Sequence, residues 1–133
     1  MARAAQDPEL KAAFQTHEQE TQAQYERLSE VFDALGKRPT GKTCDAIEGI
    51  IAEAQEIMEE FKGSPALDAG LLAAAQAVEH YEIARYGTLK AWAAQLGLAD
   101  AERLLDQTLQ EETATDEILT GLAETVINAA AQG

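Results

Sequence analysis

Three pairs of side chains that can bind metal ions recur along this sequence, each at the spacing of one helical turn. The pairs are His17 with Glu20, Glu79 with Glu82, and Glu112 with Asp116. Residues three or four positions apart share one face of a helix, so both members of a pair can reach the same ion. Carboxylates with a single imidazole suit iron or manganese better than a soft metal. We interpret the six residues as ligands of two iron or manganese ions, a site that could oxidise Fe(II) with oxygen or peroxide.

Each pair interrupts an apolar stripe near the middle of an expected helix. Carboxylates gathered in a core repel one another and lose hydration, which raises their pKa values unless a cation joins them. Any single pair is more simply a solvated flank, because 24 acidic residues place some three or four apart by chance. Three interruptions are harder to attribute to chance. Two interpretations therefore remain open. One is a metal site, and the other is a metal-free bundle whose polar pairs set the helix register.

Other reactive side chains have simpler interpretations. His80 directly follows Glu79 and points about 100° away from that stripe. We therefore expect it at the surface, or in contact with a ligand residue, rather than bound to the metal itself. Tyr86 lies one turn after Glu82, where a core position is simplest and a hydrogen bond to a ligand or a redox role is the alternative. Cys44 is expected to be a small buried residue at a helix start, with a reactive thiol as an unsupported alternative.

The remaining aromatic residues are expected mainly in the core. Trp92 is interpreted as a packing anchor. Tyr25 and Tyr81 are expected in the core or at its boundary, together with Tyr86.

Hydrophobic periodicity predicts four helices and no strands, over about 8–35, 43–61, 68–96 and 100–130. Asp7 can cap the first helix, and Gly97 can end the third. The stripe of the third helix includes Leu89, and that of the fourth ends at Val126. Short connections favour antiparallel neighbours, so we predict an all-α bundle forming one domain over 1–133.

Composition excludes several classes of protein. The chain has 133 residues, 46% of them hydrophobic, and 24 acidic side chains against 10 basic ones give a net charge of −14. That charge argues against nucleic acid or an anionic membrane as partner. No apolar leader or membrane-spanning run is visible, and the single cysteine cannot form an internal disulfide. We therefore expect a soluble cytoplasmic protein.

One motif matches a known pattern but lacks its context. Residues 36–43, Gly-Lys-Arg-Pro-Thr-Gly-Lys-Thr, fit the phosphate-binding P-loop letter for letter. A P-loop follows a buried strand, whereas a charged amphipathic helix precedes this segment. No later apolar strand ends in an aspartate that would hold magnesium. We interpret the segment as a basic, glycine-rich turn between helices.

Three segments resemble blocks of the YciE/YciF-type ferritin-like family. They are 17–21 (His-Glu-Gln-Glu-Thr), 44–50 (Cys-Asp-Ala-Ile-Glu-Gly-Ile) and, most distinctively, 76–82 (Gln-Ala-Val-Glu-His-Tyr-Glu). The resemblance extends over about 9–125 and implies a ferritin-like four-helix bundle associated with stress responses, with a dinuclear metal site. It puts the inward polar groups at His17, Glu20, Glu79, Glu82, Glu112 and Asp116.

The chain departs from this family at its start. The family normally begins with another long helix, and only seven residues precede Pro8 here. Without that helix its neighbours would expose apolar stripes, so we expect a homodimer in which a second subunit covers the gap. The alternatives are an inward shift of the short helix that carries Glu48 and Glu53, or a truncated form.

Overall fold

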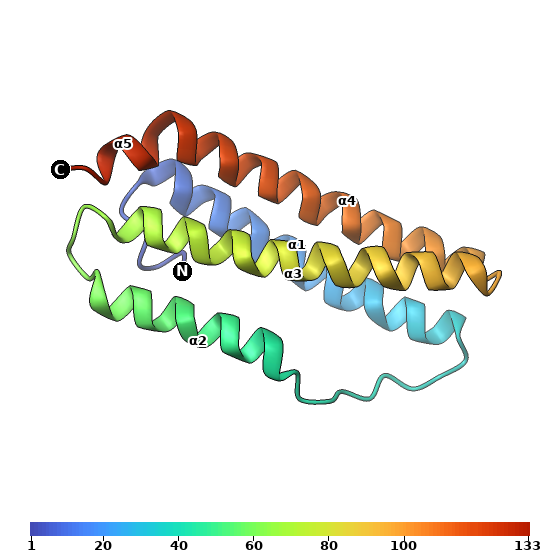
Figure 1. Cartoon of the computed structure of the whole chain (residues 1–133). Helices are drawn as coiled ribbons and strands as arrows, with labels where there is room; N and C mark the ends of the chain where they lie inside the picture. The colour runs from blue at the N-terminus through green and yellow to red at the C-terminus, as the bar shows by residue number, and fades with distance from the viewer.

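The computed structural model describes residues 1–133 as an all-α, ferritin-like bundle without strands, which confirms the predicted class (Figure 1). The four main helices begin within two residues of the predicted positions. None of them combines the length and the apolar character that a membrane span requires. In chain order the elements are α1 (Pro8–Ala34), α2 (Asp45–Glu60), α3 (Leu67–Gln95), α4 (Ala99–Leu122), the π-helical turn η1 (Ala123–Ile127) and α5 (Asn128–Ala130).

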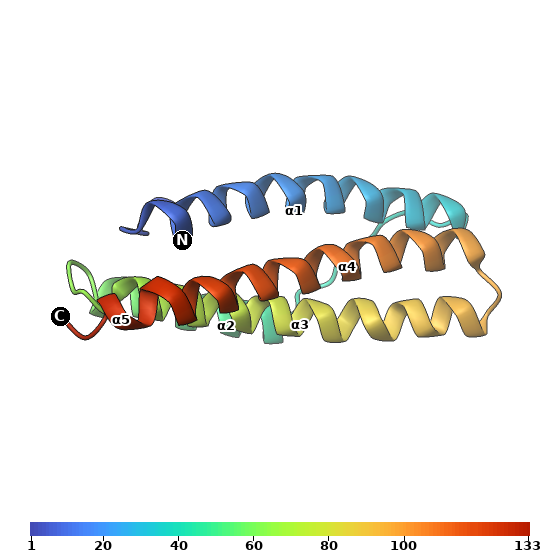
Figure 2. The same ribbon diagram turned by 90° about the horizontal axis from the view of Figure 1, so that it is seen from above.

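Helix α4 is the centre of the packing. It packs against both α1 and α3, whereas α2 packs on α3. Helices α1 and α3 run in one direction, and α4 and α2 run in the other (Figures 1 and 2). The segment 36–44 leads from the end of α1 to the start of α2, and it follows a helix rather than a strand. This arrangement brings the midpoints of α1, α3 and α4 to one level.

Two aspartates fix the start of α1. The Oδ1 atom of Asp7 accepts hydrogen bonds from the backbone N–H groups of Glu9 and Leu10, both at 2.9 Å, as expected of an N-cap. The buried Asp68, at the start of α3, accepts the N–H of Gln6 at 2.8 Å and that of Asp7 at 2.7 Å. These bonds tie the beginning of α1 to the beginning of α3 and so set their relative height.

The apolar core is divided into two clusters at opposite ends of the bundle. The larger cluster includes Leu10, Phe14 and Leu71, and it also buries Ala5 from the segment before α1. The smaller one centres on Val31 at the other end of α1. Between them the middle of the bundle is polar, as the interrupted stripes predicted.

The predicted stripe of the last helix is wrong at its end. Val126 was expected on the core face and is 38% exposed, while Ile127 is 1% exposed. The π-helical turn η1 contains these residues. A π-turn holds an extra residue per turn, so it rotates the following side chains and brings Ile127 inward.

Several residues expected in the core or at its boundary lie instead at the surface. Trp92 is 62% exposed, Tyr25 is 69% exposed and Leu89 is 41% exposed. Trp92 therefore anchors no packing within this chain. The reason is that the sides of α1 and α3 on which these residues lie have no neighbouring helix to cover them.

Candidate metal centre

Three helices bring four ligand-type side chains together in the polar middle of the bundle. His17 comes from α1, Glu79 and Glu82 from α3, and Glu112 from α4. Each offers one nitrogen or oxygen atom, and these atoms all lie within 4.8 Å of one another. The three-residue spacing of Glu79 and Glu82 turns both carboxylates to the same side of α3.

The imidazole of His17 connects the helices. Its Nε2 atom lies 3.0 Å from Oε1 of Glu79 and 3.9 Å from Oε2 of Glu112. Its Nδ1 atom lies 3.4 Å from the hydroxyl of Thr115 and 3.7 Å from Oε2 of Glu20. The ring therefore has carboxylates near both nitrogens.

Burial makes this group unusual. Glu112 is 0% exposed and Glu79 is 2% exposed. Oε2 of Glu79 and both carboxylate oxygens of Glu112 have no hydrogen-bond donor. Buried polar atoms are nearly always paired, since an unpaired one loses its hydration without compensation. A cation bound by these oxygens would remove that penalty, so the donor set fits iron or manganese.

The pKa values of the group also reflect the burial of several carboxylates close to one another. Burial, followed by the neighbouring Glu79 and Glu82, raises the pKa of Glu112 to about 9. Burial and the charge of Glu79 also raise the pKa of Glu82. The hydrogen bond to Glu79 raises the pKa of His17, although burial alone would lower it. Without a cation, the group retains protons to relieve the repulsion among its carboxylates.

The structure brings together four of the six predicted ligands and places the other two differently. Glu20 lies beside His17 at the edge of the group. Asp116 lies outside it, because its Oδ1 accepts from Nε2 of Gln76 at 3.0 Å and lies 3.0 Å from Nε2 of His80. Thr115, one residue earlier, occupies the position on α4 that faces His17.

Sequence reasoning missed a polar network next to the centre. The guanidinium of Arg27 donates two hydrogen bonds to the carboxylate of Glu111, at 2.7 and 2.8 Å, and one to the hydroxyl of Thr108 at 2.8 Å. The buried Gln24 also donates to Glu111, at 3.2 Å. Nothing in the sequence pairs Gln24 with Glu111. This network fixes α1 against α4 at Thr108 and at Glu111, the residue directly before Glu112.

Two other reactive side chains have defined surroundings. Burial, then the charges of Glu82 and Glu112, raises the pKa of Tyr86. Tyr86 also packs against the smaller apolar cluster. Cys44 is half-buried at the N-cap of α2, where its sulfur lies 2.9 Å from the hydroxyl of Tyr81. That hydrogen bond, with backbone N–H groups at the helix start, lowers the pKa of Cys44.

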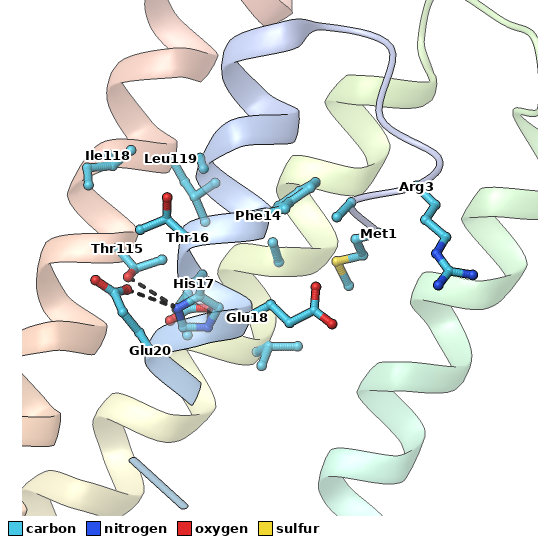
Figure 3. A pocket seen from close by; sticks show the side chains of 15 residues that line it. Met1, Arg3, Phe14, Thr16, His17, Glu18, Glu20, Thr115, Ile118 and Leu119 are labelled. Atoms are coloured by element: carbon cyan, nitrogen blue, oxygen red, sulfur yellow. Dashed lines mark hydrogen bonds and ion pairs between the residues drawn. The ribbon is translucent and has the colours of Figure 1, made fainter. Parts of the chain in front are cut away.

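A cavity of about 550 Å³ leads to the centre (Figure 3). Its lining includes His17 and Glu79 of the group itself, with Glu20 close by. Apolar side chains such as Phe14 and Leu119 form other parts of the wall. Figure 3 shows Thr115 and Glu20 directed at the His17 ring. Small molecules or ions can reach one side of the group through this cavity.

Fold and centre together define a ferritin-like helical bundle with a buried carboxylate–histidine group. The chain belongs to the family described as "Domain of unknown function (DUF892)", whose model matches residues 1–132. It is 45% identical over 133 residues to protein YciF of Escherichia coli (strain K12). The alignment covers 99% of this chain and 80% of YciF. The resemblance to the YciE/YciF-type family is thereby confirmed.

Two solved structures are similar to this chain. The crystal structure of the E. coli stress protein YciF matches with a TM-score of 0.90 and 46% identity, over 96% of this chain and 80% of that one. YcfI of Rhodopseudomonas palustris, for which a structural role has been suggested, matches with a TM-score of 0.87 and 48% identity. This match covers 90% of this chain and 76% of YcfI. Both are similar enough to confirm the fold.

Proposed function

We propose that this protein is a metal-binding helical bundle that holds iron or manganese in a stress response. The observation that carries the proposal is the set of buried carboxylate oxygens on Glu79 and Glu112 that lack any donor. They lie beside an imidazole and a third carboxylate, which is the chemistry of an iron or manganese site in a helical bundle. The role in stress is taken from the description of the similar YciF.

Different residues of the chain would have different roles in such a site. His17, Glu79, Glu82 and Glu112 would bind metal, and the Arg27–Glu111 ion pair nearby would keep α1 and α4 in register. We propose two ions. The four-residue group accounts for one of them. Glu20, whose Oε2 lies 3.7 Å from Nδ1 of His17, would supply a carboxylate for the second, whereas the predicted Asp116 contacts His80 instead.

Iron held by His17, Glu79, Glu82 and Glu112 would supply redox chemistry, the oxidation of Fe(II) to Fe(III) with oxygen or peroxide as the oxidant, and the carboxylates would stabilise the higher charge. The cavity beside His17 and Glu20 gives Fe(II), as the substrate, an acidic route to the group. The single cysteine and its lack of an internal disulfide partner fit a reducing compartment, so we propose the cytoplasm.

One observation favours a second candidate, a metal-free stress or interaction module. The 3.0 Å contact between His17 and Glu79 pairs one buried charge without any metal. Polar contacts of this kind can fix helix register in a bundle. This alternative leaves the oxygens of Glu112 unpaired, which is why we place the metal site first.

Titration of the metal-free protein with Mn(II), and with Fe(II) under anaerobic conditions, tests the proposal. We expect up to two ions per chain by elemental analysis and an affinity at least 100-fold lower in Glu112→Gln, because the buried ligand loses its charge. Glu117→Gln is the matched control, since Glu117 is exposed on the same helix. A wild-type protein that binds neither metal, and whose melting temperature neither metal changes, would contradict the proposal and support the metal-free module.

A further inference from the structure

The cavity beside the metal centre is larger than a route for ions requires. Helix α1 packs closely on α4 and has only slight contact with α3, and the cavity of about 550 Å³ lies along this part of α1 (Figure 2). Side chains of all three helices line it, together with the first three residues of the chain. Pockets for small organic ligands typically have about 300–1,000 Å³. The cavity therefore has room for an organic molecule.

The lining of the cavity changes from apolar to polar along the bundle. Each of the three helices contributes an apolar side chain about one turn, or 5.4 Å, from a polar one. The pairs are Phe14 and His17 on α1, Ala75 and Glu79 on α3, and Leu119 and Thr115 on α4. Helix α4 runs opposite to α1 and α3, and its pair has the opposite order in the sequence. All three apolar side chains therefore lie at one end of the cavity, and the three polar ones lie at the other.

The apolar end belongs to the larger apolar cluster of the core. Phe14, Ala75 and Leu119 are all members of that cluster, and they are 8%, 5% and 1% exposed. Side chains that are fixed by packing form a wall in advance, so a ligand does not have to order them when it binds. Each CH₂ group that a ligand buries against this wall should strengthen binding roughly fourfold. This end of the cavity favours a hydrocarbon chain or ring.

The polar end of the cavity is acidic. Glu18, Glu20 and Glu79 line the cavity, whereas Arg3 is the only lysine or arginine in the lining. Figure 3 shows Glu18 and Glu20 on opposite sides of His17. Glu79 is 2% exposed, and its Oε2 atom has no hydrogen-bond donor. An ammonium group offers three donors to such carboxylates, whereas a negatively charged group would be repelled by them. The net charge of −14 adds to this preference.

We propose that the cavity is a binding site for a small amphipathic cation, a molecule with an apolar chain or ring and one ammonium group. Its apolar part lies against Phe14, Ala75 and Leu119, and its ammonium group lies at the acidic end beside His17. A protonated primary amine is the simplest ligand of this class. The site is formed by side chains of this chain alone, so the amine binds without a metal ion.

Isothermal titration calorimetry with octylamine at pH 7, in the presence of a chelator, tests this site. Butylamine and octanoate are the matched probes, because the first has a shorter chain and the second has the opposite charge. We expect one octylamine per chain, bound about 100-fold more tightly than butylamine because its longer chain buries more CH₂ groups. Octanoate should bind about tenfold more weakly than octylamine, since its carboxylate meets the acidic end.

Two variants locate the bound molecule. Ala13 is half-buried in the lining next to Phe14, so Ala13→Phe puts a large ring into the apolar end and should weaken octylamine binding about 30-fold. The double variant Glu18→Gln with Glu20→Gln should remove the preference for octylamine over octanoate. Glu26→Gln with Glu30→Gln is its matched control. These two carboxylates are exposed on the same helix and lie outside the lining, so octylamine should bind this variant as it binds the wild type.

Trp92 distinguishes the cavity from the exposed apolar side chains farther along α3. It is the only tryptophan and lies about 25 Å along the helix from Ala75, so octylamine in the cavity should leave its emission unchanged. Emission that changes in proportion to the octylamine bound would mean that the amine binds elsewhere, and this overturns the proposal.

Three other outcomes overturn the proposal as well. They are no binding of octylamine, binding that is no tighter than that of butylamine or octanoate, and binding that a folded Ala13→Phe leaves intact. Circular dichroism checks that each variant retains its helices, and the glutamine variants keep the test valid if Ala13→Phe does not fold. Metal titration of the same samples is a separate measurement, so the metal centre and the amine site can fail independently.

Discussion

Two histidine–carboxylate contacts in this protein have the same nitrogen–oxygen distance and different surroundings. Nε2 of His17 lies 3.0 Å from Glu79, and Nε2 of His80 lies 3.0 Å from Asp116. The side chains of the first contact are 18% and 2% exposed, and those of the second are 64% and 23% exposed. Residue type and distance alone would rank the two contacts equally as places for a cation.

The difference lies in how the carboxylate oxygens are satisfied. Asp116 also accepts a hydrogen bond from Gln76 and remains open to water. Glu79 has an oxygen without any donor, and the adjacent Glu112 has two. A partly hydrated ion pair gains little from a metal, whereas unpaired buried carboxylates gain both charge neutralisation and coordination. The comparison teaches that unsatisfied buried oxygens, rather than the residue types, distinguish the candidate centre.

The stability of the metal-free protein should depend on pH through the buried contact. The pKa of Glu112 is raised to about 9 from its ordinary 4.5, and that of His17 is raised above 6.5. Between pH 5.5 and 8.5 the folded state therefore retains protons that the unfolded state has lost, so stability falls as pH rises. Each retained proton contributes at most about 4 kcal/mol over this range. Chemical denaturation of chelator-treated protein at several pH values measures the slope.

Glu112→Gln sharpens this test, because the amide cannot ionise and most of the slope should disappear. The lowered pKa values of Glu111 and Asp106 lie in the acidic range, below the pH values used. The lowered pKa of Cys44 makes stability rise with pH, but this contribution is common to the wild type and Glu112→Gln and leaves their difference unchanged. Saturating Mn(II) should also reverse the trend, since metal binding displaces the protons. A wild-type stability that is constant or rises with pH in the chelator would show that the buried carboxylates are already ionised and satisfied.

Removing each histidine should affect metal binding very differently. We expect His17→Ala to weaken Mn(II) binding about 100-fold, or about 2.7 kcal/mol, because it removes a proposed ligand. His80→Ala should change the affinity less than twofold, since His80 contacts only the hydrated Asp116. Isothermal titration calorimetry on both variants compares them directly. Equal losses would mean that the two contacts are equivalent and that burial does not select the site.

Much of the fold follows from local patterns in the sequence. The three- and four-residue periodicity, the Asp7 cap and Gly97 are all short-range signals, and they predicted where the helices begin and where α3 ends. The shift from Val126 to Ile127 was not predictable, because a π-turn leaves no clear mark on the apolar pattern. The exposure of Trp92 depends on which helix faces lack a neighbour. A periodic pattern carries no information about that.

The candidate site was predictable only in part. The positions of His17, Glu79 and Glu112 on the apolar stripes predicted that these side chains face inward, and the structure brings them together. Spacing did not distinguish Asp116 from Thr115, which lie four and three residues after Glu112 and are about equally close in angle. The rotation of α4 against α3 decides between them, and it depends on packing along the whole helix.

Asp116→Asn should have the smallest effect of all. The amide retains the size of the side chain and can still accept from Gln76, while only a half-exposed contact with His80 loses charge. We expect a change of less than about 0.5 kcal/mol in the free energy of unfolding, and an unchanged Mn(II) affinity. Urea denaturation at pH 7 together with metal titration measures both. A substantial loss of metal affinity would place Asp116 among the ligands and require α4 to rotate when metal binds, so this small effect decides whether the metal-free geometry already has its final ligand set.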